Sequence, residues 1–424
     1  MKINELKQAI VDGKFDNTFN TLYFGIEVPK KRYLNALDKF VEIYKDSGEV
    51  RLFSAPGRTE IGGNHTDHQH GSVLAGSVDL DVIAVVSENN ENVIRIKSQG
   101  YDMDTIDVLD LDKKEKEVGR AAALIRGVCK AVSDRGYTLK GFNAYTTSNV
   151  LKGSGLSSSA AFEVLVGNIL NSVCCQNKID NVELAKIGQF AEKEYFGKPC
   201  GLLDQMASSL GGITFADFKD PTNPLSNSLS FDLHKFGHTL CVVDTGGNHA
   251  NLTGDYADIT LECKAVSNAL GVEFLRDADT KLFYSKLGEI RQKTNDRAVL
   301  RAIHFFNEQQ RVYDEMDAIK KGDFDEFLRL VNESGNSSYK FLQNLYSTSL
   351  VTEQGLSLAI ALTEKFLNGK GACRVHGGGF AGTIQCYIPN DMLADYKAYM
   401  EAVFGENSCC VLGIRPVGGT EVKM

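Results

Sequence analysis

Residues 149–161 read NVLKGSGLSSSAA and join a strand pattern at 142–147 to an apolar helical face at 162–169. One interpretation is a flexible Gly/Ser linker, but linkers do not run without a break between a strand and a buried helix. The glycines would let the backbone approach an anion, while N–H groups at the helix start point towards it. The stretch therefore predicts a phosphate-binding loop.

Two better known phosphate-binding patterns do not fit this loop. The chain has no GxxxxGK[ST], so the loop is not a Walker loop. A dinucleotide fold would place GxGxxG within a parallel βαβ unit, with an acidic residue about 20 positions later. Ser157, Ser158 and Ser159 instead offer hydroxyls to phosphate oxygens or Mg²⁺.

A second polar stretch, residues 57–71, reads GRTEIGGNHTDHQHG between two apolar stretches. One alternative is a metal site, because His65, His68 and His70 form H-x-x-H-x-H. Three surface histidines in a loop are another alternative, which leaves Arg58 and Asp67 unexplained. A Gly-flanked connection between strands suits the binding of a small polar ligand better, so we expect a sugar site.

Both stretches resemble motifs of the GHMP kinases, the family of galactokinase, homoserine kinase, mevalonate kinase and phosphomevalonate kinase. The loop resembles the second family motif, P-x-G-x-G-L-x-S-S-A, with Leu151 in place of Pro. Residues 55–68 are similar to the galactokinase signature, roughly APGRVNLIGEHTDY. Two of the positions that differ stand out, because Asn64 stands where galactokinases have Glu and His68 stands where they have Tyr.

Three later segments extend this resemblance. Residues 191–211, AEKEYFGKPCGLLDQMASSLG, are similar to the galactokinase segment AE-x-x-F-x-G-x-x-CGIMDQ. Residues 251–263, NLTGDYADITLEC, are similar to S-S-E-Y-x-x-R-R-x-x-C without its paired Arg. Residues 374–382, RVHGGGFAG, resemble the third family motif, R-M-T-G-G-G-F-G-G, with His376 for Thr and Ala381 for Gly.

The resemblance implies a role for each matched residue. Arg58 and Asp204 would be catalytic, and Ser159 and Glu192 would bind Mg²⁺. The expected sugar contacts are Arg58, Asn64, His65, Thr66, Asp67, Gly201, Asp204 and Tyr256. The expected ATP contacts are Ser98, Gly153, Ser154, Gly155, Leu156, Ser157, Ser158 and Ser159.

The implied chemistry agrees with these residue types. A sugar hydroxyl is a poor nucleophile, so a carboxylate that accepts its proton, or holds it in line, helps the attack on the γ-phosphate. Alone, an Asp after two Leu would more often be a helix cap or a buried, hydrogen-bonded carboxylate. Arg58 beside Asp204 would keep the carboxyl ionised, so Asp204 is either a base or an electrostatic organiser.

The pattern of apolar residues predicts a mixed α+β chain with grouped elements. The resemblance implies the GHMP kinase fold, with a ribosomal-S5-like N-terminal domain and a ferredoxin-like C-terminal domain. We expect a helical arm over 1–48, a sugar- and ATP-binding domain over 49–224 and a second domain over 225–424. A strand at 93–96 is expected to form a hairpin with the strand at 78–86.

Composition limits the ligands that the chain can bind. Its 424 residues carry a net charge of −9, which argues against nucleic acid or an anionic membrane as partner. The N-terminus lacks the apolar core of a signal peptide and no stretch of about 18 apolar residues occurs, so we expect a cytoplasmic protein. The ten Cys are expected to be reduced and mostly buried. We expect a monomer or weak oligomer.

The resemblance implies transfer of the γ-phosphate of ATP to the anomeric hydroxyl of galactose, with Mg²⁺ as cofactor. Asn64 keeps a carbonyl acceptor but loses the charge of Glu, which would weaken one sugar contact. A related sugar, N-acetylgalactosamine or arabinose, is therefore an alternative substrate. A non-catalytic galactose and ATP sensor is a further alternative, although the Ser158, Ser159 and Ala160 that such sensors lose are present.

Overall fold

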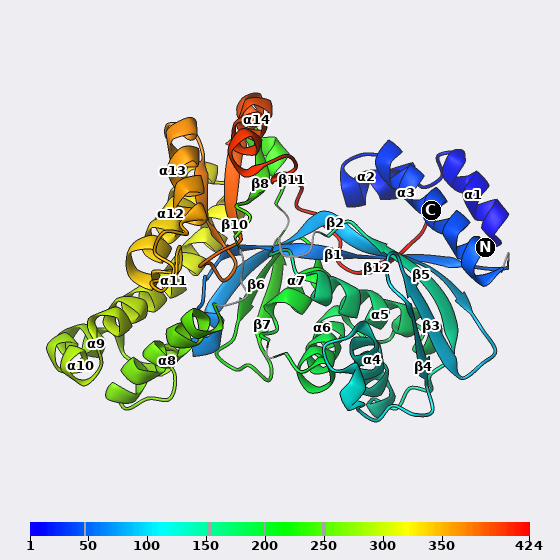
Figure 1. The fold of residues 1–424 in the computed structure, drawn as a ribbon, viewed down its shortest axis with the longest axis horizontal. Helices are drawn as coiled ribbons and strands as arrows, with labels where there is room; N and C mark the ends of the chain where they lie inside the picture. The colour runs from blue at the N-terminus through cyan, green and yellow to red at the C-terminus, as the bar shows by residue number, and fades with distance from the viewer. Residues whose placement is uncertain (46–47, 151–154, 199, 230, 248–251) are drawn as a thin grey trace.

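The computed structural model describes residues 1–45, 48–150, 155–198, 200–229, 231–247 and 252–424. Its larger sheet has eight strands in the order β12-β1-β2-β5-β3-β4, with β6 paired to β2 and β7 to β6 (Figure 1). These strands are β1 (Arg51–Gly62), β2 (Ser72–Glu88), β3 (Val93–Ser98), β4 (Met103–Asp107), β5 (Phe142–Ser148), β6 (Ile213–Asp217), β7 (Leu225–Leu229) and β12 (Thr420–Val422).

Helices cover both faces of this sheet, because its central strands are apolar on both sides. On β2, Ile83 and Val85 pack against the N-terminal helices, while Val82, Ala84 and Val86 face the opposite core. The N-terminal helices are α1 (Ile3–Val11), α2 (Asp16–Tyr23) and α3 (Glu27–Tyr44). On the other face lie α4 (Ala121–Asp134), α5 (Ser158–Cys174), α6 (Asn181–Phe190), a π-helical turn (Ala191–Phe196) and α7 (Leu203–Leu210) (Figure 1).

A smaller sheet of four strands has the order β11-β8-β10-β9. Its strands are β8 (His238–Asp244), β9 (Ala372–His376), β10 (Thr383–Pro389) and β11 (Cys409–Leu412). The helices of this part are α8 (Thr253–Ala269), α9 (Thr280–Ser285), α10 (Leu287–Lys293), α11 (Asp296–Lys321), α12 (Phe324–Ser337), α13 (Gly355–Leu367) and α14 (Leu393–Phe404). The mixed α+β organisation expected from the sequence is confirmed.

The expected hairpin between the strands at 78–86 and 93–96 is wrong. β2 pairs antiparallel with β5, and β5 separates β2 from β3. β3 pairs parallel with β5 and antiparallel with β4. Alternating apolar residues specify which face of a strand is buried, but they do not specify its neighbour, and β5 arrives only after helix α4.

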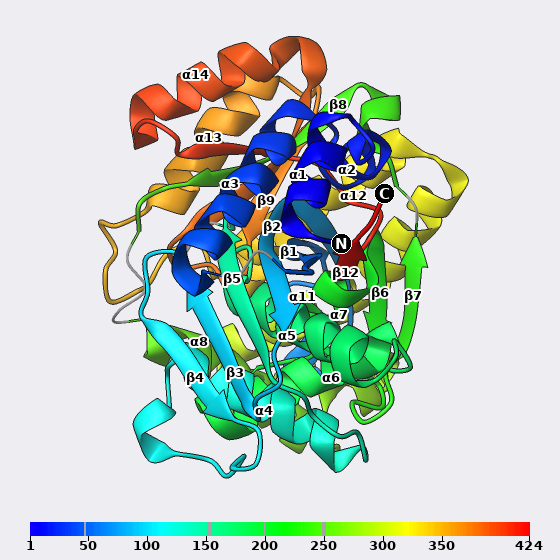
Figure 2. The ribbon, with the colours of Figure 1, turned by 90° about the vertical axis from the view of Figure 1, so that its right-hand side faces the viewer.

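The C-terminal end of the chain returns to the first sheet and to the N-terminal helices. β12 pairs with β1, and the Thr18 hydroxyl donates a hydrogen bond to the Lys423 carbonyl oxygen at 2.8 Å. Both termini lie on this side of the molecule (Figure 2). The domain boundaries at residues 48 and 224 stay predictions. No helix among the described residues is long and apolar enough to cross a membrane.

One buried carboxylate, Asp81 on β2, joins the N-terminal helices to this sheet. Tyr23 donates a hydrogen bond to its Oδ2 at 2.7 Å, and Arg32 forms an ion pair with its Oδ1. Arg415 approaches Oδ2 at 3.3 Å. Burial opposes the charge of Asp81, but the two guanidinium groups outweigh it and keep the pKa of the carboxyl below its usual value.

Asp81→Asn is expected to lower the free energy of unfolding by about 3 kcal/mol, because two arginines lose their buried counter-charge. Equilibrium unfolding in urea measures this change. The control is Asp38→Asn, since Asp38 pairs with Lys7 at the surface and its side chain is 67% exposed. That variant should lose less than about 1 kcal/mol. Equal, small losses in both variants would contradict the assigned role of Asp81.

Candidate active site

The described part of the phosphate-binding loop is a tight turn that leads into α5. Gly155 and Ser157 both have left-handed backbone conformations, with φ of 73° and 55°. The Leu156 carbonyl oxygen accepts a hydrogen bond from the Arg58 backbone N–H at 3.0 Å. Because of this turn, Ser158 and Ser159 lie in the first turn of α5, whose N-terminal N–H groups favour an anion.

Two of the expected ATP contacts, Gly153 and Ser154, lie outside the described residues. Strand β1 approaches the described part of the loop closely at Gly57, the first residue of the polar stretch 57–71. A Cβ atom at Gly57 would lie 2.7 Å from the Leu156 carbonyl oxygen, so a larger residue would separate the loop from the strand. The sequence blocks at 57–71 and 149–161 are thus in direct contact, as a shared site requires.

Arg58 and Asp204 form an ion pair beside this loop. The Arg58 Nε donates to Asp204 Oδ1 at 2.7 Å, and its terminal nitrogen donates to the Gly155 carbonyl oxygen. The Ser157 hydroxyl donates to Asp204 Oδ2. Asp204 is in the first turn of α7, and its side chain is 32% exposed. Burial alone would raise the pKa of Asp204, but Arg58 and Ser157 outweigh it and hold the pKa below its usual value.

A second carboxylate, Glu192, contacts Ser159. Its Oε1 accepts hydrogen bonds from the Ser159 hydroxyl and the Lys198 ammonium, each at 3.0 Å. Gln205 donates to Glu192 Oε2 at 2.8 Å and to Glu163 Oε2 at 2.9 Å, which joins two buried carboxyl groups. Burial, and then repulsion by Glu192, raise the pKa of Glu163 well above its usual value, which favours its protonated form.

Residues of the polar stretch 57–71 line a cavity of about 270 Å³ next to the Arg58–Asp204 ion pair. Six expected site residues line it, namely Arg58, Asn64, His65, Asp67, Gly201 and Asp204. Gly201 lies against Asp67, because a Cβ atom on Gly201 would be 2.8 Å from Asp67 Oδ2. The structure therefore brings together residues from β1, the following loop and the approach to α7.

Three other expected residues do not line this cavity. The Thr66 hydroxyl is buried and donates to the carbonyl oxygens of Gly63 and Ser72, so it shapes the loop. The Tyr256 hydroxyl donates to the Gly379 carbonyl oxygen at 2.8 Å. Ser98, at the end of β3, accepts a hydrogen bond from Thr146 at 2.8 Å.

The histidines of the block do not form a metal site in the described part of the chain, which contains no group of three metal-ligating side chains. His70 stacks on Phe274 with a centroid distance of 3.6 Å. His68 is enclosed, and burial lowers its pKa to about 4. The His65 Nε2 lies 2.9 Å from the Gly378 carbonyl oxygen.

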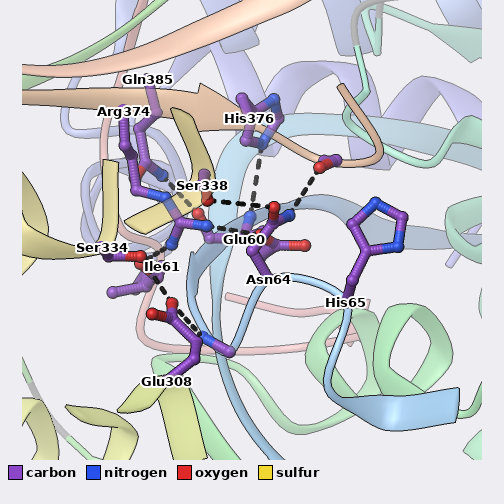
Figure 3. Close-up of polar contacts among 12 residues, drawn as sticks. Glu60, Ile61, Asn64, His65, Glu308, Ser334, Ser338, Arg374, His376 and Gln385 are labelled. Carbon is purple, nitrogen blue, oxygen red and sulfur yellow. Dashed lines mark hydrogen bonds and ion pairs between the residues drawn. The ribbon is translucent and has the colours of Figure 1, made fainter. Parts of the chain in front are cut away.

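Sequence reasoning missed Glu60, which is part of the cavity wall. Arg374 donates to Glu60 Oε1 at 2.8 Å, and its other terminal nitrogen donates to the Ile61 carbonyl oxygen. In Figure 3, Glu60 and Asn64 lie between Arg374 and His65. The sequence did contain one signal for Glu60. It is a charged residue two positions after Arg58, so both side chains lie on one face of β1.

His376, which replaces Thr in the third motif, links the two sheets as a neutral imidazole. Burial lowers its pKa to about 3, and Arg58 adds repulsion. Its Nε2 accepts the Glu60 backbone N–H at 3.3 Å, so its Nδ1 carries the proton and donates to the Thr383 hydroxyl at 2.9 Å. This arrangement fixes the backbone of β1 where Glu60 enters the cavity.

Two family models match the chain. The galactokinase galactose-binding signature matches residues 38–88, and the N-terminal domain of GHMP kinases matches residues 123–212. Galactokinase of Actinobacillus pleuropneumoniae serotype 5b (strain L20) is 30% identical over 363 residues, which cover 84% of this chain and 89% of that protein. Galactokinase of Limosilactobacillus reuteri (strain DSM 20016) is 27% identical over 386 residues, covering 87% and 93%.

Solved structures show the same fold. The galactokinase of Lactococcus lactis complexed with galactose matches with a TM-score of 0.76 and 22% identity, covering 92% of this chain and all of that one. The mevalonate kinase of Methanococcus jannaschii matches with a TM-score of 0.56 and 14% identity, covering 87% and 99%. The GHMP kinase fold expected from the sequence is confirmed. With motifs, fold and relatives in agreement, the chain belongs to the galactokinase family of GHMP kinases.

Proposed function

We propose that the chain transfers the γ-phosphate of ATP to the anomeric hydroxyl of galactose, giving galactose 1-phosphate and ADP. The observation that supports this most directly is the Arg58–Asp204 ion pair, which lies between the sugar cavity and the phosphate-binding loop. A nucleophile in the cavity would therefore meet a phosphoryl group on the loop at these two side chains.

In this mechanism Asp204 binds the anomeric hydroxyl and holds it in line with the γ-phosphorus. Its lowered pKa makes it a weak base before the reaction, so positioning and charge contribute first. As the sugar oxygen bonds to phosphorus and the bond to the β-phosphate oxygen breaks, the hydroxyl becomes acidic and its proton passes to Asp204. Arg58 stabilises the negative charge on the phosphoryl oxygens.

The loop and the start of α5 would hold the triphosphate. Gly155, Leu156 and Ser157 present backbone groups in the turn, and Ser158 and Ser159 add hydroxyls. The family motif adds Gly153 and Ser154 to the proposed ATP contacts. The expected contact between Ser98 and ATP stays a prediction. A cytoplasmic location and a monomer or weak oligomer are also part of the proposal.

Mg²⁺ fits the donors at the start of α5. Mg²⁺ prefers oxygen ligands, and Ser159 and Glu192 offer a hydroxyl and a carboxylate that already lie 3.0 Å apart. The Lys198 ammonium pairs with the same Glu192 oxygen, which indicates that this carboxylate attracts a cation. When bound, the ion would neutralise charge on the phosphate oxygens of ATP.

Galactose is expected to give the highest kcat/KM in an ADP-release assay that also includes N-acetylgalactosamine, arabinose, glucose and mevalonate. The reason is that the galactose-binding signature matches residues 38–88, which include the cavity-lining residues from Arg58 to Val73. Phosphorylation of mevalonate without phosphorylation of any sugar would contradict the proposal. Nuclear magnetic resonance of the product should show phosphorus coupled to the anomeric proton.

Asp204→Asn is expected to lower kcat by about 10² to 10⁴-fold, since the amide cannot accept the hydroxyl proton. The KM for ATP should stay within about threefold of the wild-type value, because Asp204 contacts the nucleophile and not the nucleotide. Asp180→Asn is the control, because Asp180 is an exposed N-cap of α6 and Asn caps equally well. A fully active Asp204→Asn enzyme would remove Asp204 from the mechanism.

Glu192→Gln is expected to raise the Mg²⁺ concentration needed for half-maximal activity by about tenfold or more, because a charged ligand becomes neutral. Glu163→Gln is the matched control. Among the described residues the Glu163 carboxyl group accepts a hydrogen bond from Gln205 and none from Ser159. Burial raises its pKa, which favours the neutral form that Gln resembles, so this substitution should leave the Mg²⁺ requirement unchanged. A titration of activity against Mg²⁺ measures both, and equal shifts would contradict the assignment of Glu192.

A further inference from the structure

The Asn64 side chain has no hydrogen-bonding capacity left for a sugar. An amide offers two N–H donors and two acceptor positions. Asn64 Nδ2 donates to Glu60 Oε1 at 2.8 Å and to the Gly377 carbonyl oxygen at 2.7 Å. Its Oδ1 accepts from Asn344 Nδ2 at 2.9 Å and from the Ser338 hydroxyl at 3.3 Å. The side chain is fully buried, so its contacts are with protein groups.

The Glu60 side chain, unlike that of Asn64, has hydrogen-bonding capacity left for a ligand. Its Oε1 is held by Arg374 and Asn64, but no residue that the structure describes donates a hydrogen bond to Oε2. The side chain is only 12% exposed, and Glu60 is one of the residues that line the cavity. A carboxylate oxygen removed from bulk water needs a donor, and a ligand hydroxyl in the cavity would supply it.

We propose that Glu60, and not Asn64, provides the carboxylate that selects the sugar, through a hydrogen bond from a hydroxyl distant from the anomeric carbon. This inference rests on the proposed function, because it assumes that the anomeric hydroxyl lies at Asp204. Within galactokinases the signature places Asn and Glu at the positions of Glu60 and Asn64. The chain therefore keeps one amide and one carboxylate but exchanges their places.

The position of Glu60 along β1 decides which hydroxyl it reaches. Arg58 and Glu60 pair in register with Ser77 and Ala75 of β2 and lie on the same face of the strand. Two residues of a strand span about 6.6 Å, which is comparable to the distance across a pyranose with its hydroxyls. With the anomeric end at Arg58 and Asp204, Glu60 is placed to bind the far side of the ring.

The network around Glu60 fixes the carboxylate before the sugar binds. Arg374 is fully buried on β9 and holds Oε1, while Asn64 donates to the same oxygen. The backbone of Glu60 is held by His376 and by Gln385, which donates to its carbonyl oxygen at 2.7 Å. A carboxylate held in this way loses little conformational freedom when a hydroxyl binds Oε2.

The test measures galactose binding to Glu60→Gln by calorimetry, with a non-hydrolysable ATP analogue present, and KM values by ADP release. We expect the Kd and KM for galactose to rise about tenfold, because a hydrogen bond to a charged acceptor becomes one to a neutral acceptor. The KM for ATP should stay within about twofold. A deoxy sugar that lacks the hydroxyl bound by Glu60, either 4-deoxygalactose or 6-deoxygalactose, should bind the wild-type protein less tightly than galactose does. In Glu60→Gln most of this difference in Kd should disappear.

Two further variants separate this role from a general effect on folding. Glu60→Asp keeps the charge beside Arg374 but withdraws the carboxylate from the cavity, so galactose binding should also weaken. Glu315→Gln is the matched control. Glu315 is fully buried on α11 and does not line the cavity, and burial raises its pKa, which favours the neutral form that Gln resembles. Its galactose Kd should be unchanged.

The outcomes distinguish this inference from the proposed function. A galactose Kd within twofold of wild type in both Glu60 variants, or an unchanged disadvantage of both deoxy sugars, would overturn the role of Glu60. Wild-type protein that binds galactose but releases no ADP would refute the kinase function alone, because calorimetry still tests Glu60. Wild-type protein that does not bind galactose would refute both.

Discussion

The ion pair between Arg374 on β9 and Glu60 on β1 joins the smaller sheet to the larger one at the sugar cavity. Arg374 is fully buried and the Glu60 side chain is 12% exposed, so the two groups stabilise each other's charge. The pair also positions Asn64 and, through the strand, Arg58. Glu60 and Arg374 are 314 positions apart in the sequence, and the two sheets meet at this buried charge pair, on which the geometry of the site depends.

Charge is distributed in the site according to the chemistry that we propose. At the phosphoryl end, Arg58 holds the pKa of Asp204 below its usual value, while burial and repulsion by Glu192 raise the pKa of Glu163. At the far end, burial raises the pKa of Glu60, and the Arg374 guanidinium opposes this rise. We propose that the sugar lies between the carboxyl groups of Asp204 and Glu60, of which Asp204 lies beside the phosphate-binding loop.

The sequence predicted helices and strands better than it predicted which strands pair with each other. The phosphate-binding loop and α5 were expected from glycine positions and apolar periodicity, and the approach to α7 from the resemblance to galactokinases. The structure brings the described part of the loop into contact with Asp204 of α7. The β2–β3 hairpin failed because periodicity does not reveal that β5 inserts between these strands. Glu60 was missed for a related reason. Its role depends on Arg374, Asn344 and Ser338, which lie about 280 to 310 residues away, and no local pattern carries that information.

The most direct measurement is a crystal structure of the protein with galactose and a non-hydrolysable ATP analogue. The account predicts the anomeric hydroxyl within hydrogen-bond distance of Asp204 and a distant hydroxyl on Glu60 Oε2. It also predicts that Asn64 keeps its four contacts within the protein. A sugar bound by the Asn64 side chain with Glu60 Oε2 unoccupied, or with its anomeric hydroxyl away from Asp204, would contradict the account.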